Sequence, residues 1–396
     1  MTIEVLDVPV LDEGRRALRE IAATKRVVVC VGSGGVGKTT TAATLGLLGA
    51  MLGRRSLVIT IDPARRLANA LGLDALSHAP QRIDEGVIRA AGVQTKAELC
   101  AMMLDLKAAW DDMLFRTAPD AASAKKILEN RFYTTLSNDM PGAHEFIACE
   151  CLHHLAASGA WDLVVLDTPP TSNALDFLEA PSRILAVLDN EAFRYFAQRK
   201  QSLGLRFLDG AAGRAQSVLA RFAGTEVLEE LGDFIVLLRD LYDPLTQRTR
   251  DFEALLRGDG TRFCVVTSPQ PAALSEARFF LQELARRELK TGALILNQVT
   301  PSPGQAKDIL AESGWEQLLV ERGLSAASAA TLAAILDESV RQQEKLAALD
   351  DANVQEMLAY AETTTRVPTV RVPKLTDAVH DARRLAELVP WLAGPM

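Results

Sequence analysis

Short apolar runs recur along the chain, and most are followed by turn residues and then by a helical pattern. The runs cover residues 26–31, 56–61, 163–166, 263–267, 293–296 and 369–372. Continuous apolar runs of this length are typical of strands buried on both faces, as in a parallel sheet covered by helices. Their alternation with helical segments predicts an α/β fold with a doubly wound, mostly parallel sheet.

Two stretches interrupt this alternation. Between residues 96 and 137 no strand is expected, because the apolar positions follow a helical period: Leu99, Met102, Met103, Leu106, Trp110, Met113 and Leu114. Residues 181–257 also follow a helical pattern throughout. We interpret both stretches as parts of one helical subdomain that is inserted between strands. The expected core then consists of residues 1–95, 138–180 and 258–396.

A glycine-rich loop follows the first predicted strand and opens a predicted helix. Residues 32–39 read GSGGVGKT and match the phosphate-binding pattern G-x-x-x-x-G-K-T. Its backbone N–H groups would surround phosphate, Lys38 would reach the β- and γ-phosphates, and the Thr39 hydroxyl would hold Mg²⁺. The pattern therefore predicts ATP and Mg²⁺ as ligands. The expected nucleotide contacts are Gly34, Gly35, Val36, Gly37, Lys38, Thr39 and Thr40.

Three polar residues end other predicted strands, at the edge where open α/β sheets bind ligands. Asp62 could orient or deprotonate an attacking water, or it could simply cap the next helix. Asp167 fits a carboxylate that holds Mg²⁺ directly or through water, with a strand-end cap as the alternative. Asn297 offers an amide that suits an adenine edge, although a turn asparagine is the more common explanation. Prolines 169 and 170 stiffen a loop that could respond to the γ-phosphate.

Composition narrows the function class. The net charge of −8 argues against a protein that coats nucleic acid, because such binding needs many Lys and Arg side chains. No uninterrupted apolar stretch approaches 18 residues, and the N-terminus lacks a secretion signal, so a cytoplasmic protein without stable membrane insertion is expected. Five cysteines do not suggest a disulfide framework. Cys149 and Cys151 lie near His153 and His154, and buried thiols are favoured there over a metal site.

The motifs GSGGVGKTT, IDPARRLANALGL, LDTPPTSNALDFLEAP and LNQV occur in that order and together resemble the ArsA/Get family of ATPases. The resemblance implies an ATPase core with a helical insertion that works as a nucleotide-bound dimer. It also implies that Asp62 activates water and that Asp167 opens a second switch loop. Asn297 would contact adenine, and the loop from Val372 to Leu375, including Pro373, would form the second wall of the base pocket.

One departure from this family pattern affects the functional hypothesis. The family usually has a lysine where this chain has Ser33, and that lysine reaches the partner's phosphates across the dimer. The leading hypothesis is an ATP-driven homodimeric switch that acts on an unknown protein client through its helical subdomain. Two alternatives remain: a weakly active subunit of a heterodimer whose partner supplies the lysine, and an arsenite-type pump motor. Net acidity and the absence of a C-terminal basic amphipathic helix weigh against a partitioning ATPase.

Overall fold

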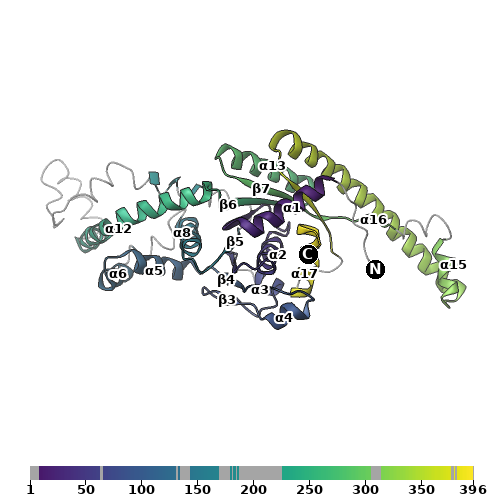
Figure 1. Cartoon of the computed structure of the whole chain (residues 1–396), viewed down its shortest axis with the longest axis horizontal. Helices are drawn as coiled ribbons and strands as arrows, with labels where there is room; N and C mark the ends of the chain where they lie inside the picture. The colour runs from purple at the N-terminus through teal and green to yellow at the C-terminus, as the bar shows by residue number, and fades with distance from the viewer. Residues whose placement is uncertain are drawn as a thin grey trace.

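Eight strands form a single sheet in the computed structural model, in the order β3-β4-β2-β5-β1-β6-β7-β8 (Figure 1). Neighbouring strands pair in parallel, except that β3 runs antiparallel to β4 at one edge. The strands are β1 (Val27–Val31), β2 (Ser56–Thr60), β3 (Gln81–Arg82), β4 (Leu99–Met103), β5 (Leu163–Asp167), β6 (Thr261–Thr267), β7 (Thr291–Val299) and β8 (Thr369–Pro373).

The structure describes residues 9–62, 66–130, 133, 143–168, 179–180, 182–183, 185–186, 225–304, 314–375, 379 and 381–395. The helices are α1 (Pro9–Thr24), α2 (Lys38–Met51), α3 (Arg66–Ala70), α4 (Glu85–Ala90), α5 (Leu106–Thr117), α6 (Ala121–Leu128), α8 (Ala143–Ala157), α12 (Thr225–Arg257), α13 (Pro271–Arg286), α15 (Gly314–Glu321), α16 (Ala326–Tyr360) and α17 (Ala382–Ala393). A π-helical turn, η2 (Ala361–Thr365), continues α16.

Helices cover both faces of the sheet, and the alternation of side chains along each strand divides the core in two. In β1, Val27 and Val29 join the cluster beneath α8, α12, α13 and α16. Val28 and Cys30 point to the opposite face and join the cluster beneath α1, α2, α3 and α17. Because successive strand residues point to opposite faces, only a wholly apolar strand can serve both clusters. The predicted doubly wound, mostly parallel α/β sheet is therefore confirmed.

All six strands predicted from the apolar runs are present, but the region from residue 96 to 137 differs from expectation. Residues Leu99–Met103 form β4, which pairs in parallel with β2, and the helix α5 begins only at Leu106. The expectation that no strand lies there was wrong. Five successive apolar residues fit either a strand or a helical segment that is buried on all sides, and pairing with β2 decides between them. The two-residue edge strand β3 was also not predicted.

The helices α5, α6 and α12 lie together at one end of the molecule, with α8 between them and the sheet (Figure 1). The second stretch predicted as helical, residues 181–257, is described mainly through α12, and residues 187–224 lie outside the described part. No helix among the described residues combines the length and the apolar character needed to cross a membrane.

A buried carboxylate joins three of these helices. Glu150 lies on α8, and its side chain is only 2% exposed. Its Oε2 accepts a hydrogen bond of 2.7 Å from Arg116 of α5. Its Oε1 accepts one of 2.5 Å from Arg248 of α12. Two charge-assisted bonds to one buried acid fix the positions of α5 and α12 against α8, the helix that precedes β5.

Replacing this acid should destabilise the fold. Glu150→Ala leaves two partly buried guanidinium groups without their partner, and we expect a loss of about 3 kcal/mol in the free energy of unfolding. Urea unfolding followed by tryptophan fluorescence measures the change. Glu387→Ala removes an acid from the exposed pair with Arg384 and serves as the control, with an expected loss of about 0.5 kcal/mol or less. Equal losses in the two variants would contradict the prediction.

Candidate functional site

The glycine-rich loop between β1 and α2 has a backbone that only glycine fits at two positions. Gly37 has a φ of 93°, and a Cβ there would lie 2.2 Å from the side-chain nitrogen of Asn297. Gly32 has a φ of 152°, and a Cβ there would lie 2.0 Å from the carbonyl oxygen of Val266. The glycines therefore allow both the left-handed turn and the close approach of the loop to β6 and β7.

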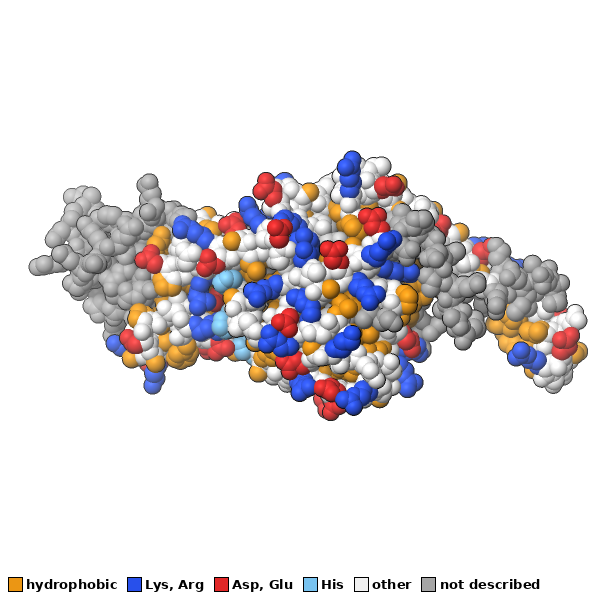
Figure 2. Space-filling view, in the orientation of Figure 1, with side chains coloured by type: hydrophobic (Ala, Val, Ile, Leu, Met, Phe, Trp, Pro, Cys, Tyr) orange, Lys and Arg blue, Asp and Glu red, His pale blue; other side chains and the backbone are white. Residues whose placement is uncertain are grey.

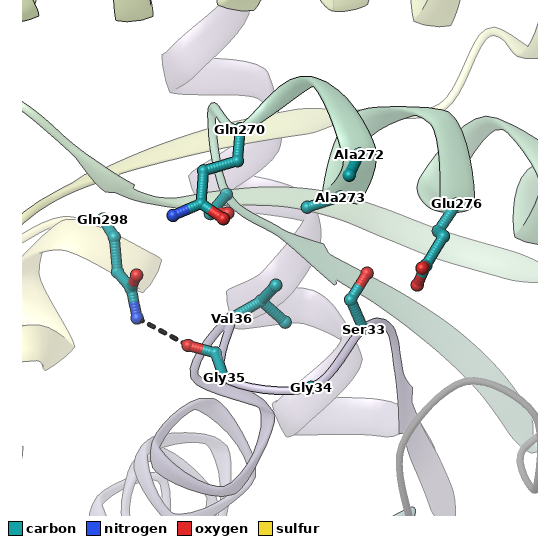
Figure 3. Close-up of a pocket in the computed structure, with 10 residues that line it drawn as sticks. Ser33, Gly34, Gly35, Val36, Gln270, Ala272, Ala273, Glu276 and Gln298 are labelled. Carbon is teal, nitrogen blue, oxygen red and sulfur yellow. Dashed lines mark hydrogen bonds between the residues drawn. The ribbon is translucent and has the colours of Figure 1, made fainter.

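Two amide side chains from the end of β7 hold this loop from outside. Asn297 donates its Nδ2 hydrogen to the carbonyl of Val36 at 2.8 Å. Gln298 donates from Nε2 to the carbonyl of Gly35 at 2.9 Å (Figure 3). A loop that binds phosphate must present its N–H groups in a fixed direction, and each of these bonds fixes one peptide plane. The role of Gln298 was not predicted, although its position after Asn297 at a strand end was visible in the sequence.

Lys38 begins α2 and lies folded against its own loop. Its Nζ donates to the carbonyl oxygen of Ser33 at 2.7 Å. Burial lowers the pKa of Lys38 from its ordinary value, and the nearby Asp167 carboxylate and Cys30 partly oppose that shift. Thr40 lies in the first turn of the same helix and is half-buried. The helix therefore starts with a buried amine beside the loop that the sequence assigned to phosphate.

Asp167 is the most buried acid of this region and lies at the end of β5. Its Oδ2 accepts hydrogen bonds from the Thr39 hydroxyl at 2.7 Å and from the Thr60 hydroxyl at 3.0 Å. Its Oδ1 is buried and has no hydrogen-bond partner. Burial raises the pKa of Asp167 to about 6, whereas the two hydroxyl bonds and the charge of Lys38 lower it. The carboxylate is thus held in place on one side only.

This donor set fits Mg²⁺. A hydroxyl and a carboxylate are hard oxygen ligands of the kind that Mg²⁺ prefers, and Asp167 Oδ1 is an oxygen in need of a partner. Thr39 and Asp167 would hold the ion, directly or through water, and Mg²⁺ would neutralise charge on the phosphates of bound ATP. Sequence reasoning missed Thr60, which is paired with Asp167 in the register of β2 and β5. The sequence feature that could have revealed Thr60 is a hydroxyl at the end of a strand whose middle residues, 57–59, are apolar.

Asp62 lies just past the end of β2 at the same edge of the sheet. Its backbone N–H donates to the Thr60 hydroxyl at 3.2 Å. Its carboxylate lies 3.5 Å from the guanidinium of Arg66 and is 23% exposed. The charge of Asp62 contributes to the raised pKa of Asp167, although burial is the larger cause. The structure therefore brings Asp62, Lys38, Thr39 and Asp167 to one side of the loop.

The residues expected to contact the base also end neighbouring strands. Asn297 lies near the end of β7, and Pro373 ends β8, where it pairs in register with Val299. The Lys374 N–H donates to the Val299 carbonyl at 2.8 Å and holds the chain against β7 just beyond that strand end. The second switch loop expected after Asp167, including prolines 169 and 170, lies outside the described residues.

A polar pocket with a volume of about 320 Å³ opens beside the loop, between residues 33–36 and the start of α13. Figure 3 shows the side chains of Ser33 and Glu276 pointing toward the space between loop and helix. The Ser33 hydroxyl oxygen is buried and makes no hydrogen bond. Gln270 lines the pocket at the beginning of α13. A carboxyl group, that of Glu276, therefore lies beside the loop in this pocket.

The cysteine and histidine cluster on α8 has the properties of buried packing residues. Burial raises the pKa of the Cys149 thiol and of the Cys151 thiol. Burial also lowers the pKa of His153 and of His154. In the part of the chain that the structure describes, no group of three or more His, Cys, Asp or Glu side chains is placed to hold a metal ion.

The raised pKa of Asp167 predicts a dependence of stability on pH. The folded pKa of about 6 exceeds the ordinary value near 4, so folding costs free energy as pH rises between them. Asp167→Asn removes that cost, and we expect it to stabilise the nucleotide-free chain by roughly 3 kcal/mol at most above pH 6. The gain should vanish as pH falls toward about 4. Urea unfolding in EDTA at several pH values measures it.

Asp162→Asn provides a control of opposite sign. The Arg55 side chain lowers the pKa of Asp162 to about 2, so the ionised form of Asp162 favours folding. The Asp162→Asn chain should therefore be less stable than the native chain at neutral pH.

Asp167→Asn should also weaken the effect of Mg²⁺ on ATP affinity, because a metal ligand is lost. A chain with Asp167→Asn that is less stable than the native chain near pH 8 would contradict the analysis of burial.

The comparisons agree with this geometry. A family model described as an anion-transporting ATPase matches residues 25–321. ATPase GET3 of Malassezia globosa is 26% identical over 370 residues, which cover 93% of this chain and 91% of that protein. ATPase GET3A of Arabidopsis thaliana is 29% identical over 68% of this chain and 65% of its own length.

A further relative is the uncharacterized protein SCO2128 of Streptomyces coelicolor, which is 29% identical over 70% of this chain and 63% of its own length. The family model covers well over half of the chain, and its range contains the glycine-rich loop and the strand ends that meet at Asp167. This chain therefore belongs to the anion-transporting ATPase (ArsA) family and is an ATP-hydrolysing enzyme.

Proposed function

We propose that the chain is a cytoplasmic, Mg²⁺-dependent nucleotide switch that closes as a dimer on ATP and resets on hydrolysis. The observation that carries this proposal is the meeting of three elements on one carboxylate. Asp167 of β5 accepts hydrogen bonds from Thr39 of the phosphate loop and from Thr60 of β2. A ligand that binds between Thr39 and Asp167 would therefore act on the carboxylate that also joins the ends of β2 and β5.

The residues around this carboxylate have separate roles in the proposal. Lys38 exchanges its bond to the Ser33 carbonyl for the phosphates of ATP. Asp62 lies on the Thr60 side and orients the attacking water, as acids and amides do in related phosphoryl-transfer sites. Asn297 and Pro373 form the base side, where Asn297 can keep its bond to Val36 because its amide has a second N–H.

A mechanical connection links this site to the helices at the end of the molecule. The helix α8 is connected through residues 158–162 to β5, which ends at Asp167. Through Glu150, α8 also holds Arg116 of α5 and Arg248 of α12. We propose that residues 104–137 and 181–257 form a helical subdomain whose surface, reshaped through α8, binds a protein client.

A heterodimer is the second candidate, and Ser33 favours it. The Ser33 hydroxyl faces the pocket that Glu276 also lines, and none of the described residues that line this pocket is a lysine or an arginine. A partner subunit that carries the family's lysine would bring a positive charge to this side. An arsenite-type pump has less support, because all five cysteines are buried within this chain.

The role of Asp62 leads to a direct test. Asp62→Asn keeps the shape but removes the charge that would orient water, so we expect turnover to fall by roughly 100-fold or more. The affinity for ATP should stay within about twofold, because Asp62 does not belong to the phosphate loop. Steady-state hydrolysis and equilibrium nucleotide binding measure the two effects. Asp74→Asn changes an exposed acid and should leave both unchanged; full turnover with Asp62→Asn would refute the assignment.

The dimer proposal predicts how activity depends on protein concentration. In a homodimeric switch, hydrolysis per chain rises with concentration and reaches a plateau as the dimer forms. Measuring the MgATP hydrolysis rate over a dilution series tests this. If the chain binds ATP and yet stays inactive at every concentration, the homodimer proposal fails. In that case Ser33→Lys should restore turnover, as expected when the missing cation comes from a partner.

A further inference from the structure

The long helix α16 carries an uncovered row of large apolar side chains. Its 35 residues span about 50 Å, and it runs from the sheet core to the far end of the molecule, where α15 packs on it (Figure 1). Leu332 and Ile335 are 37% and 59% exposed, and Leu346 and Leu349 are 56% and 63% exposed. These four make up half of the exposed large hydrophobics among the described residues. Figure 2 shows hydrophobic atoms uncovered at this end of the molecule.

The side of α16 next to this row is used differently. Its buried residues are mainly small near the far end, with Ala329 and Ala333, and larger near the core, with Val354 and Met357. The helix is therefore anchored to its own chain through one side. The exposed row (Leu332, Ile335, Leu346 and Leu349) borders that anchored side, yet each of its side chains is more than a third exposed, so holding α16 in place does not account for the row.

The spacing of the exposed row is that of a coiled-coil seam. From residue 332 the positions advance by three and four in turn, through 335, 339, 342 and 346 to 349. Alternating steps of three and four keep all six side chains on one narrow face of a helix. Ser339 and Gln342 occupy the middle of the seam, and apolar residues occupy both ends. This arrangement is more regular than scattered exposed side chains on a solvated helix.

The order of apolar and polar residues along the seam is the same in both directions of the helix. Reversal about its centre, between Val340 and Arg341, exchanges Leu332 with Leu349 and Ile335 with Leu346, and it places Ser339 opposite Gln342. An antiparallel pair of identical helices would therefore bury apolar side chains against apolar ones at both ends. The hydroxyl and the amide would meet in the middle, where they can form hydrogen bonds twice by symmetry.

The flanking charges complement each other in the same arrangement. Glu338 and Lys345 both precede a seam position and lie exposed on the same edge of the seam. In an antiparallel pair, this edge of one helix lies along the same edge of the other, so Glu338 faces Lys345 of the second copy, and Lys345 faces its Glu338. Two ion pairs would form, and symmetry places no like charges opposite each other at these positions.

We propose that α16 is a self-association surface that pairs antiparallel with α16 of a second copy of this chain through residues 332–349. Antiparallel pairing puts the two sheet cores at opposite ends of the pair. Parallel helices, which lie only about 8–10 Å apart, would force both cores to the same end. This interface differs from the proposed nucleotide-dependent dimer, whose nucleotide-binding residues, the phosphate loop and Asp167, lie in the core and not on α16. A seam of 18 residues buries a modest area, so the expected affinity is in the micromolar range.

Self-association of the whole chain without nucleotide tests the proposal. Sedimentation equilibrium of the native chain should show a reversible increase in mass above the monomer mass of 42.9 kDa. Leu346→Glu places a charge at two buried positions in each pair, so it should weaken association by roughly tenfold or more. Ala334→Glu adds the same charge to an exposed position of α16 outside the seam and should leave association unchanged.

A charge exchange tests the antiparallel register. Glu338→Lys alone and Lys345→Glu alone each create like-charge pairs and should weaken association. The double variant restores opposite charges in an antiparallel pair and should recover the native affinity. It would not do so in a parallel pair, where Glu338 lies beside Gln343 and Lys345 beside Asp350 of the second copy.

Three results would overturn the proposal. These are a native chain that remains monomeric at every concentration, association that Leu346→Glu leaves intact, and a double charge variant that associates no better than the single variants. Circular dichroism of each variant verifies that α16 remains folded, so a loss of association is not mistaken for unfolding. ATP hydrolysis per nucleotide dimer should be the same in Leu346→Glu and in the native chain, which separates this surface from the proposed nucleotide switch.

Discussion

The burial of one carboxylate governs the site. Asp167 ends a strand in the middle of the sheet, and its surroundings exclude water strongly enough to raise its pKa to about 6. Thr39 and Thr60 hold one of its oxygens, and Lys38 supplies the nearby positive charge. A buried charge that is only partly satisfied is costly, and the cost is relieved when a cation binds. This cost supports the proposal that the site binds Mg²⁺ together with the phosphates of ATP.

In the proposed switch, the same sheet would transmit what happens at that carboxylate. Asp167 is joined to α8 through β5, and α8 holds α5 and α12 through the paired arginines of Glu150. Packed helices and buried ion pairs do not deform gradually, so a shift at β5 is more easily passed on as a movement of α8 with its neighbours. The phosphate loop is fixed from the other side by Asn297 and Gln298 of β7. In the proposed switch, nucleotide would thus bind between the loop side that β7 holds in place and the β5 side, which can move with α8.

The seam on α16 contrasts with these interior contacts. Inside the chain, the anchored side of α16 carries small residues such as Ala329 and Ala333 near its far end and larger ones such as Met357 near the core. Outside, Ile335 and Leu349 remain more than half exposed, which costs solubility without any gain to the isolated fold. A second copy of the same helix is a partner that matches both the apolar ends and the flanking charges. Two separate self-contacts in one chain would allow assemblies larger than a dimer.

The sequence alone determined six of the eight strands, because apolar runs such as Val27–Val31 can be buried on both faces only between layers of helices. It also determined the phosphate loop, since Gly37 and Lys38 form a local pattern with few other uses. Asp62 and Asp167 were found as candidates because both follow strands.

Only the tertiary structure decided the rest. The run Leu99–Met103 is a strand because β2 lies beside it, and its pattern fits a helix equally well. Thr60 joins the site because of its register with Asp167, and Glu150 acquires two arginines from distant helices. Local sequence records what a residue can do, whereas the partners of a buried polar group come from distant parts of the chain and are fixed only when the layers pack.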